Sequence, residues 1–111
     1  MVTSAGRRPP SGLVGWPYPE RMGRAATGEN PDVDAGVLLA RWCRAAYGRM
    51  GEERVSQHRV ARDAGVAPRT FEQILAGDSW PEFRTLYRLS AALDIPLPGG
   101  EDPLPRLSSQ R

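Results

Sequence analysis

Lysine is missing from this chain of 111 residues, so all 15 basic residues are arginine. Cysteine and histidine occur once each, as Cys43 and His58. A single cysteine excludes an internal disulfide framework and a zinc site built on a cysteine cluster. A single histidine excludes a zinc site with three histidine ligands, and any nucleophile activated by histidine would have to use His58. These absences predict a protein that is not an enzyme and that has no metal or other cofactor.

Long hydrophobic runs are absent as well. The longest apolar stretch, Val37-Leu38-Leu39-Ala40, is far shorter than the roughly 20 residues that a membrane-spanning helix needs. Arg7-Arg8 is followed by Pro9-Pro10 rather than by an apolar stretch, which is unlike a secretion signal. We therefore expect a soluble, cytoplasmic protein with no membrane partner and no evident small-molecule substrate.

A large excess of charge of one sign is also lacking. The formal net charge is +2, and the isoelectric point is about 9.2 because arginine stays protonated at any accessible pH. Residues 32–97 are neutral overall, with 9 arginines and 9 acidic residues. Within residues 54–71, however, four arginines stand against Asp63 alone, which gives +3. The positive charge is therefore concentrated in one short stretch, as expected for a surface that meets a polyanion.

Proline and glycine divide the chain into three parts. Residues 1–31 hold five of the 11 prolines and five of the 12 glycines and show no sustained periodicity, which predicts a flexible arm. Residues 98–111 are interrupted in the same way and are predicted to be a flexible tail. Residues 32–97 are then the one folded domain.

The arm leaves two questions open. Arg7-Arg8 can enter a minor groove in the manner of homeodomain arms, but we favour an unstructured leader. Trp16 and Tyr18 are unusual in a pure linker, and aromatic residues in a proline-rich extended segment can dock on the domain or on a partner.

The folded domain has helical periodicity throughout. N-cap residues (Asn30 and Ser56), prolines at first helical positions and glycine stops predict four helices, at residues 31–50, 57–64, 68–76 and 81–93. The side chains expected to form the core are Leu39, Trp42, Cys43, Leu86, Leu89 and Leu93, and Phe83 and Ala92 share a face with the last three. The fold class expected from this pattern is all-α, a compact bundle of four to five helices.

The second and third helices carry a spaced set of residues. Gly65 lies four residues after Ala61, Phe71 lies six residues after Gly65, and Ile74 follows three residues later. A small side chain at Ala61 lets two helices cross closely, and glycine allows the left-handed conformation that a tight turn requires. Two apolar residues then anchor the following helix. This is the spacing of a helix-turn-helix.

From Val55-Ser56-Gln57 through this motif to Trp80-Pro81 and Ile95, the sequence resembles the Cro/C1-type, phage-repressor-like (XRE family) helix-turn-helix DNA-binding domains. The resemblance implies a bundle of the lambda-repressor-like type that binds double-stranded DNA and regulates transcription. Many relatives dimerise through a fifth helix, which Pro96 and Pro98 cut short here. A homodimer and another protein partner therefore both stay open.

The resemblance also assigns roles to residues. The base-contacting positions are Pro68, Arg69, Thr70, Glu72 and Gln73. The resemblance gives Gln57 as a phosphate-contacting position, and the phosphate contacts expected in all are Ser56, Gln57, Arg59 and Arg62, although a merely solvated face stays open for the two arginines. The structural positions of the motif are Ala61, Gly65, Val66, Phe71 and Ile74. Side-chain chemistry agrees with the role of two base-contacting residues. The guanidinium fork of Arg69 matches guanine O6 and N7, and the Gln73 amide matches adenine N6 and N7.

A second interpretation keeps the fold and changes the function. Glu72, Asp78 and Glu82 are acidic residues at or near the third helix, where a DNA-binding protein gains from basic ones. A helix-turn-helix protein-interaction module, such as an antitoxin or an accessory factor with little DNA reading of its own, is therefore the alternative. Binding to duplex DNA that falls steeply with salt would distinguish the two.

Overall fold

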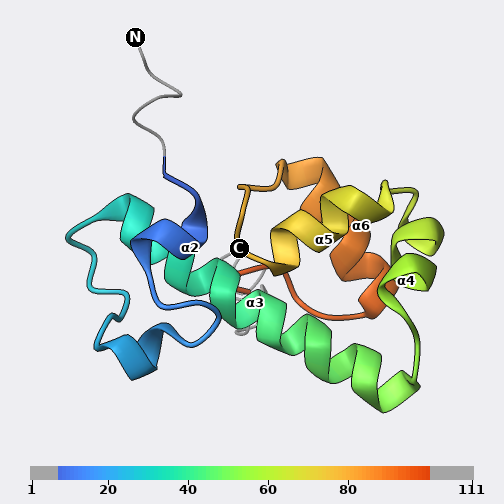
Figure 1. Cartoon of the computed structure of the whole chain (residues 1–111), viewed down its shortest axis with the longest axis horizontal. Coiled ribbons are helices and arrows are strands. Elements are labelled where there is room, and N and C mark those ends of the chain that lie inside the picture. The colour runs from blue at the N-terminus through green and yellow to red at the C-terminus, as the bar shows by residue number, and fades with distance from the viewer. Residues whose placement is uncertain (1–7, 101–111) are drawn as a thin grey trace, which may run out of the picture.

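A computed structural model describes residues 8–100 of the chain. Its elements, in chain order, are α2 (Pro10–Leu13), the 3-10 helix η1 (Pro19–Met22), α3 (Pro31–Glu53), α4 (Gln57–Ala64), α5 (Pro68–Leu75) and α6 (Phe83–Leu93) (Figure 1). Residues 8–100 contain no strand, so the predicted all-α fold class is confirmed. The long α3 runs along one side of the bundle, and α4, α5 and α6 pack together beside its second half.

α3 begins where the sequence predicts and ends three residues later than expected. The side chain of Asn30 accepts hydrogen bonds from the backbone N–H groups of residues 32 and 33, which confirms it as the N-cap. Gly48 and Gly51 face open space and do not end the helix. An exposed glycine costs a helix only about 1 kcal/mol, and burial of Ala46 and Met50 in this last part of α3 offsets that cost.

α4 and α5 have the predicted starts. The Ser56 hydroxyl accepts from the backbone N–H of Arg59 at 3.1 Å, and Pro68 opens α5 after Ala67, whose side chain makes no capping bond. Gly65 ends α4 with φ 72°, and the next amide, Val66 N–H, reaches back to the Ala61 carbonyl at 2.8 Å. This is the Schellman geometry that a left-handed glycine permits.

α6 differs from its prediction at the start and on one face. It begins at Phe83 rather than at residue 81, with Glu82 as its N-cap residue. Phe83 and Ala92 are exposed, so the expectation that they share the core face is wrong. Phe83 lies in the first turn, before α6 meets the rest of the bundle, and its ring pairs with the exposed ring of Tyr87 at 6.1 Å instead.

The core lies where α3, α4, α5 and α6 meet. The core residues that the sequence predicts on α3 and α6 are buried: Leu39, Trp42, Cys43, Leu86, Leu89 and Leu93. Phe71 of α5 is fully buried at the centre and meets the Trp42 ring edge-on, with the ring centroids 6.5 Å apart. The Trp42 indole N–H donates to the buried hydroxyl of Ser90 at 2.8 Å. This bond satisfies both polar groups inside the apolar core.

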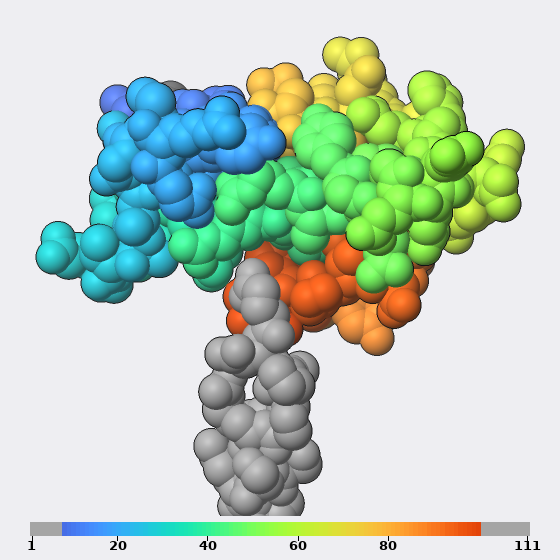
Figure 2. Space-filling view, turned by 90° about the horizontal axis from the view of Figure 1, so that it is seen from below, coloured from blue at the N-terminus to red at the C-terminus, as the bar shows by residue number. Residues whose placement is uncertain are grey.

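Residues 8–30 differ from the flexible arm that the composition of residues 1–31 predicts. Residues 8–30, here called the N-terminal segment, pack along α3 and against the end of α5, at the opposite end of the molecule from α4 (Figures 1 and 2). Pro10, Val14 and Pro19 are buried, and Trp16 packs against the core. The segment has few clustered aliphatic residues, so prolines and one tryptophan supply apolar surface for its packing instead. Residues 1–7 and 101–111, including Arg7, lie outside the described residues.

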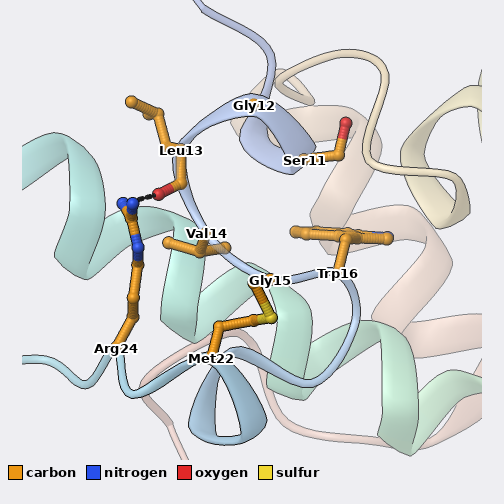
Figure 3. A pocket seen from close by; sticks show the side chains of 8 residues that line it. All are labelled: Ser11, Gly12, Leu13, Val14, Gly15, Trp16, Met22 and Arg24. Carbon is orange, nitrogen blue, oxygen red and sulfur yellow. Dashed lines mark hydrogen bonds between the residues drawn. The ribbon is translucent and has the colours of Figure 1, made fainter.

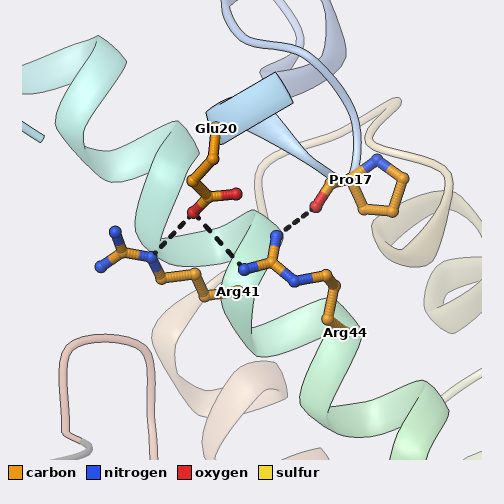
Figure 4. A network of polar contacts seen from close by, with 4 residues as sticks. All are labelled: Pro17, Glu20, Arg41 and Arg44. Carbon is orange, nitrogen blue, oxygen red and sulfur yellow. Dashed lines mark hydrogen bonds and ion pairs between the residues drawn. The ribbon is translucent and has the colours of Figure 1, made fainter. Parts of the chain in front are cut away.

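Charged side chains hold η1 on α3 (Figure 4). Glu20 pairs with Arg41 at 3.3 Å and with Arg44 at 3.5 Å, and Arg44 also donates to the Pro17 carbonyl. A hydrogen bond from its own backbone, and then the two guanidinium groups, lower the pKa of Glu20 below its ordinary value. Because the pKa is lowered in the folded state, the stabilisation is present above the ordinary carboxyl pKa and is lost as the pH falls through the lowered one.

Candidate nucleic-acid interface

The α4–α5 unit, residues 56–76, is two short helices joined by the turn at Gly65 to Ala67. Ala61 has no exposed surface, so α4 and α5 approach closely at that position. Phe71 and Ile74 are fully buried and fix α5 on the bundle, and Val66 packs against the core from the turn. The structure therefore places the five structural residues of the motif in contact with the core or in the turn itself.

The outer side of α5 carries the residues assigned to base contact. Because Phe71 and Ile74 point inward, the helical period turns Arg69 and Glu72 toward solvent. Pro68, Arg69 and Glu72 are exposed, whereas Thr70 and Gln73 are only half-exposed at the edge of the buried face. Arg69 is thus an exposed residue with the side chain best suited to a guanine edge.

The residues assigned to phosphate contact lie on α4 and at its start. Ser56, Arg59 and Arg62 are exposed and Gln57 is half-exposed. The Ser56 hydroxyl is used as the helix cap. The Arg59 Nε atom lies 3.5 Å from an Asp63 carboxylate oxygen, and both side chains are more than half exposed. An exposed pair of this kind stabilises by about 0–1 kcal/mol, so a phosphate can displace the carboxylate at little cost.

Arg88 of α6 is a cation near this unit that sequence patterns did not reveal. Its Nη1 atom lies 4.0 Å from the point that a Cβ atom on Gly65 would occupy, so the guanidinium lies beside the turn between α4 and α5. The contact depends on the packing of α4 against α6, which local spacing does not encode. The sequence offers one signal for this cation, which is the four-residue spacing of Arg84 and Arg88. Both side chains are exposed in the structure.

A pocket of about 450 Å³ lies away from the α4–α5 unit, in the N-terminal segment (Figure 3). Residues 11–16 line it together with Met22 and Arg24, and the Arg24 guanidinium donates to the Leu13 carbonyl. Across residues 8–100, no three histidine, cysteine or acidic side chains gather as metal ligands would. None of the helices in that range has an apolar stretch long enough to cross a membrane.

Cys43 is fully buried in α3, as the sequence predicts for a small hydrophobic residue. Its thiol donates to the Ile74 carbonyl of α5 at 3.5 Å, and burial raises its pKa to about 12. Since the thiolate is the reactive form, alkylation by iodoacetamide at about pH 8 is expected to be at least about 100-fold slower in the native protein than in guanidinium chloride. Equal rates in the two conditions would show that the thiol is accessible. As the sequence has one cysteine, the reaction reports on this site alone.

The function of the α4–α5 unit has to follow from its own geometry and charge. No protein-family model matches the chain, and no curated protein or solved structure matches it either.

Proposed function

We propose that this protein is a sequence-specific DNA-binding transcriptional regulator that inserts α5 into the major groove of double-stranded DNA. The α4–α5 unit is the observation that carries the proposal. Its two helices of eight residues are joined by a short turn, and the apolar side chains of α5 are buried while Arg69 projects outward. A single α-helix fits the major groove, and this arrangement presents one.

Each part of the unit has a role in this binding mode. Arg69, at the second position of α5, reads a guanine through two hydrogen bonds to O6 and N7. Arg59 and Arg62 on α4 bind phosphates and set the register of the helix on the duplex. Arg88 lies beside the turn and adds a further positive charge to the same end of the bundle. The proposal includes a bundle of the lambda-repressor-like type, membership of the Cro/C1-type family and a cytoplasmic location. The resemblance described from the sequence supports it.

Fluorescence anisotropy with the chain's own upstream DNA and with a random duplex tests the proposal, over about 50–200 mM salt. We expect tighter binding to the upstream DNA and an affinity that falls steeply with salt, because arginine–phosphate contacts release counterions. Absence of binding to either duplex at the lowest salt would refute the proposal.

Two substitutions separate base reading from phosphate binding. Arg69→Ala is expected to reduce discrimination between the two duplexes by about 1–3 kcal/mol. Arg59→Ala is expected to weaken both complexes alike and to lower the salt slope by about 1. Arg21→Ala, which removes the same charge from the exposed side of η1, serves as the control and is expected to change neither quantity. Equal effects of Arg69→Ala and Arg59→Ala on both duplexes would show that α5 is not the reading helix.

A protein-interaction module is the alternative, and the exposed carboxylate of Glu72 on the outer side of α5 favours it. Exposed Asp78 and Glu82 follow close behind in the sequence. Carboxylates at these positions repel phosphate, unless Glu72 accepts from a cytosine N4. If the anisotropy experiment detects no binding to duplex DNA, affinity capture with Arg69→Ala as the negative control becomes the test of this alternative.

A further inference from the structure

We propose that Trp16 is a positioning residue for α5, and that the N-terminal segment fixes the carboxyl end of this helix for DNA reading. The inference rests on the proposed function for its consequence, but its structural part is tested independently of DNA. The turn at Gly65 joins the first end of α5 to α4, and the buried side chains of Phe71, Ile74 and Leu75 pack the helix on the core. At its other end the backbone is bonded by Cys43 of α3, whose thiol donates to the Ile74 carbonyl, and by Trp16, which donates to the Leu75 carbonyl across a separation of 59 residues.

Two hydrogen bonds join the segment to the end of α5. The Trp16 indole N–H donates to the Leu75 carbonyl at 2.8 Å, and the Ser11 backbone N–H donates to the Gly77 carbonyl at 2.9 Å. The last carbonyls of a helix have no partner within the helix and must find one elsewhere. A helix of eight residues is too short to be stable by itself, so its orientation depends on such outside contacts.

Gly77 has no side chain, and the Trp16 ring occupies the space where a Cβ atom would be. Gly77 is buried and has φ 76°, and a Cβ atom at this position would lie 2.6 and 2.7 Å from two ring atoms and 2.9 Å from the Ser11 Cβ. Ring and backbone are therefore in direct contact, which only glycine permits. Figure 3 shows Ser11 and Trp16 pointing to the same side of the segment, away from Leu13 and Arg24.

The segment is itself fixed to the rest of the bundle. Val14 is buried and lies against Gly36 of α3, and Glu20 is paired with two arginines of α3. These contacts with α3 do not involve the Trp80 indole N–H, which donates from the loop after α5 to the carbonyl of Arg8, the first residue of the segment, at 2.7 Å. A segment anchored on α3 in this way can fix the position of the carboxyl end of α5, and loss of the Trp16 hydrogen bond is expected to loosen that end.

Trp16→Phe tests this assignment in the full-length chain, because it removes the indole donor and keeps an aromatic ring. We expect amide hydrogen exchange at residues 72–78 to become about five- to tenfold faster, the effect of one lost hydrogen bond, while residues 57–64 of α4 keep their rates. We also expect the affinity ratio between upstream and random duplex to fall several-fold with little change in the salt slope. A loss of phosphate contacts alone would weaken binding to both duplexes alike and would leave their affinity ratio unchanged.

Trp80→Phe is the matched control, because it removes an equivalent indole–carbonyl bond of the segment that does not end on α5. It is expected to leave exchange at residues 72–78 within about twofold of the unmodified chain. Unchanged α5 exchange in Trp16→Phe, uniformly faster exchange throughout the bundle, or equal acceleration by both variants would overturn the assignment. If the unmodified chain binds no duplex, the proposed function fails while the exchange experiment still decides the role of Trp16.

Discussion

Phe71→Ala is expected to lower the free energy of unfolding by about 3–5 kcal/mol, the usual cost of deleting a buried phenyl ring. Phe71 has no exposed surface and packs in the core, where its ring meets that of Trp42 of α3 edge-on. Its removal leaves a cavity in the core shared by α3, α4, α5 and α6, and a close-packed core fills such a cavity only in part. A small domain has about 5–15 kcal/mol of stability in total, so this one substitution is expected to remove a large part of it.

Urea denaturation followed by the helical circular dichroism signal measures this loss. Phe83→Ala is a closely matched control, because the chain has only these two phenylalanines and Phe83 is 69% exposed. An exposed substitution of this kind is expected to change the stability by less than about 0.5 kcal/mol. Similar effects of the two variants would mean that α5 does not pack on the bundle through Phe71.

Gly77→Ala is expected to destabilise the protein by about 2–5 kcal/mol, for two separate reasons. The left-handed backbone at φ 76° costs a non-glycine residue about 1–2 kcal/mol. The new Cβ atom would also lie 2.6 Å from the Trp16 ring, and relief of that overlap costs about 1–3 kcal/mol more. The same urea denaturation gives the total effect.

Gly65→Ala separates the two contributions. Gly65 has nearly the same backbone, with φ 72°, but the nearest atom to its Cβ position is Arg88 Nη1 at 4.0 Å. Only the backbone cost of about 1–2 kcal/mol is expected there. In a Trp16→Ala background, the cost of Gly77→Ala is expected to fall because the ring is no longer in the way, but to stay above that of Gly65→Ala because the Ser11 Cβ atom still lies 2.9 Å from the added Cβ. A cost that is unchanged in that background would show that Trp16 does not lie over Gly77.

Local signals determined the ends of several helices. Asn30 and Ser56 each bond to backbone N–H groups two or three residues ahead, and Gly65 adopts its turn conformation without help from distant residues. Such interactions join neighbours in the sequence, so their pattern is visible in the sequence itself. The inward side of α5 is equally local, because the helical period separates Phe71 and Ile74 from Arg69.

Only the tertiary structure decided how distant parts of the chain meet. The sequence by itself determined an all-helical domain, the α4–α5 pair and the outward position of Arg69. Composition predicted a flexible arm for residues 1–31. In the structure, however, the Trp16 indole donates a hydrogen bond to the Leu75 carbonyl, and its ring packs against Gly77. Arg88 lies beside the turn for the same reason, since α6 packs on α4. These contacts depend on the shape formed by other helices, and that shape exists only after the bundle has assembled.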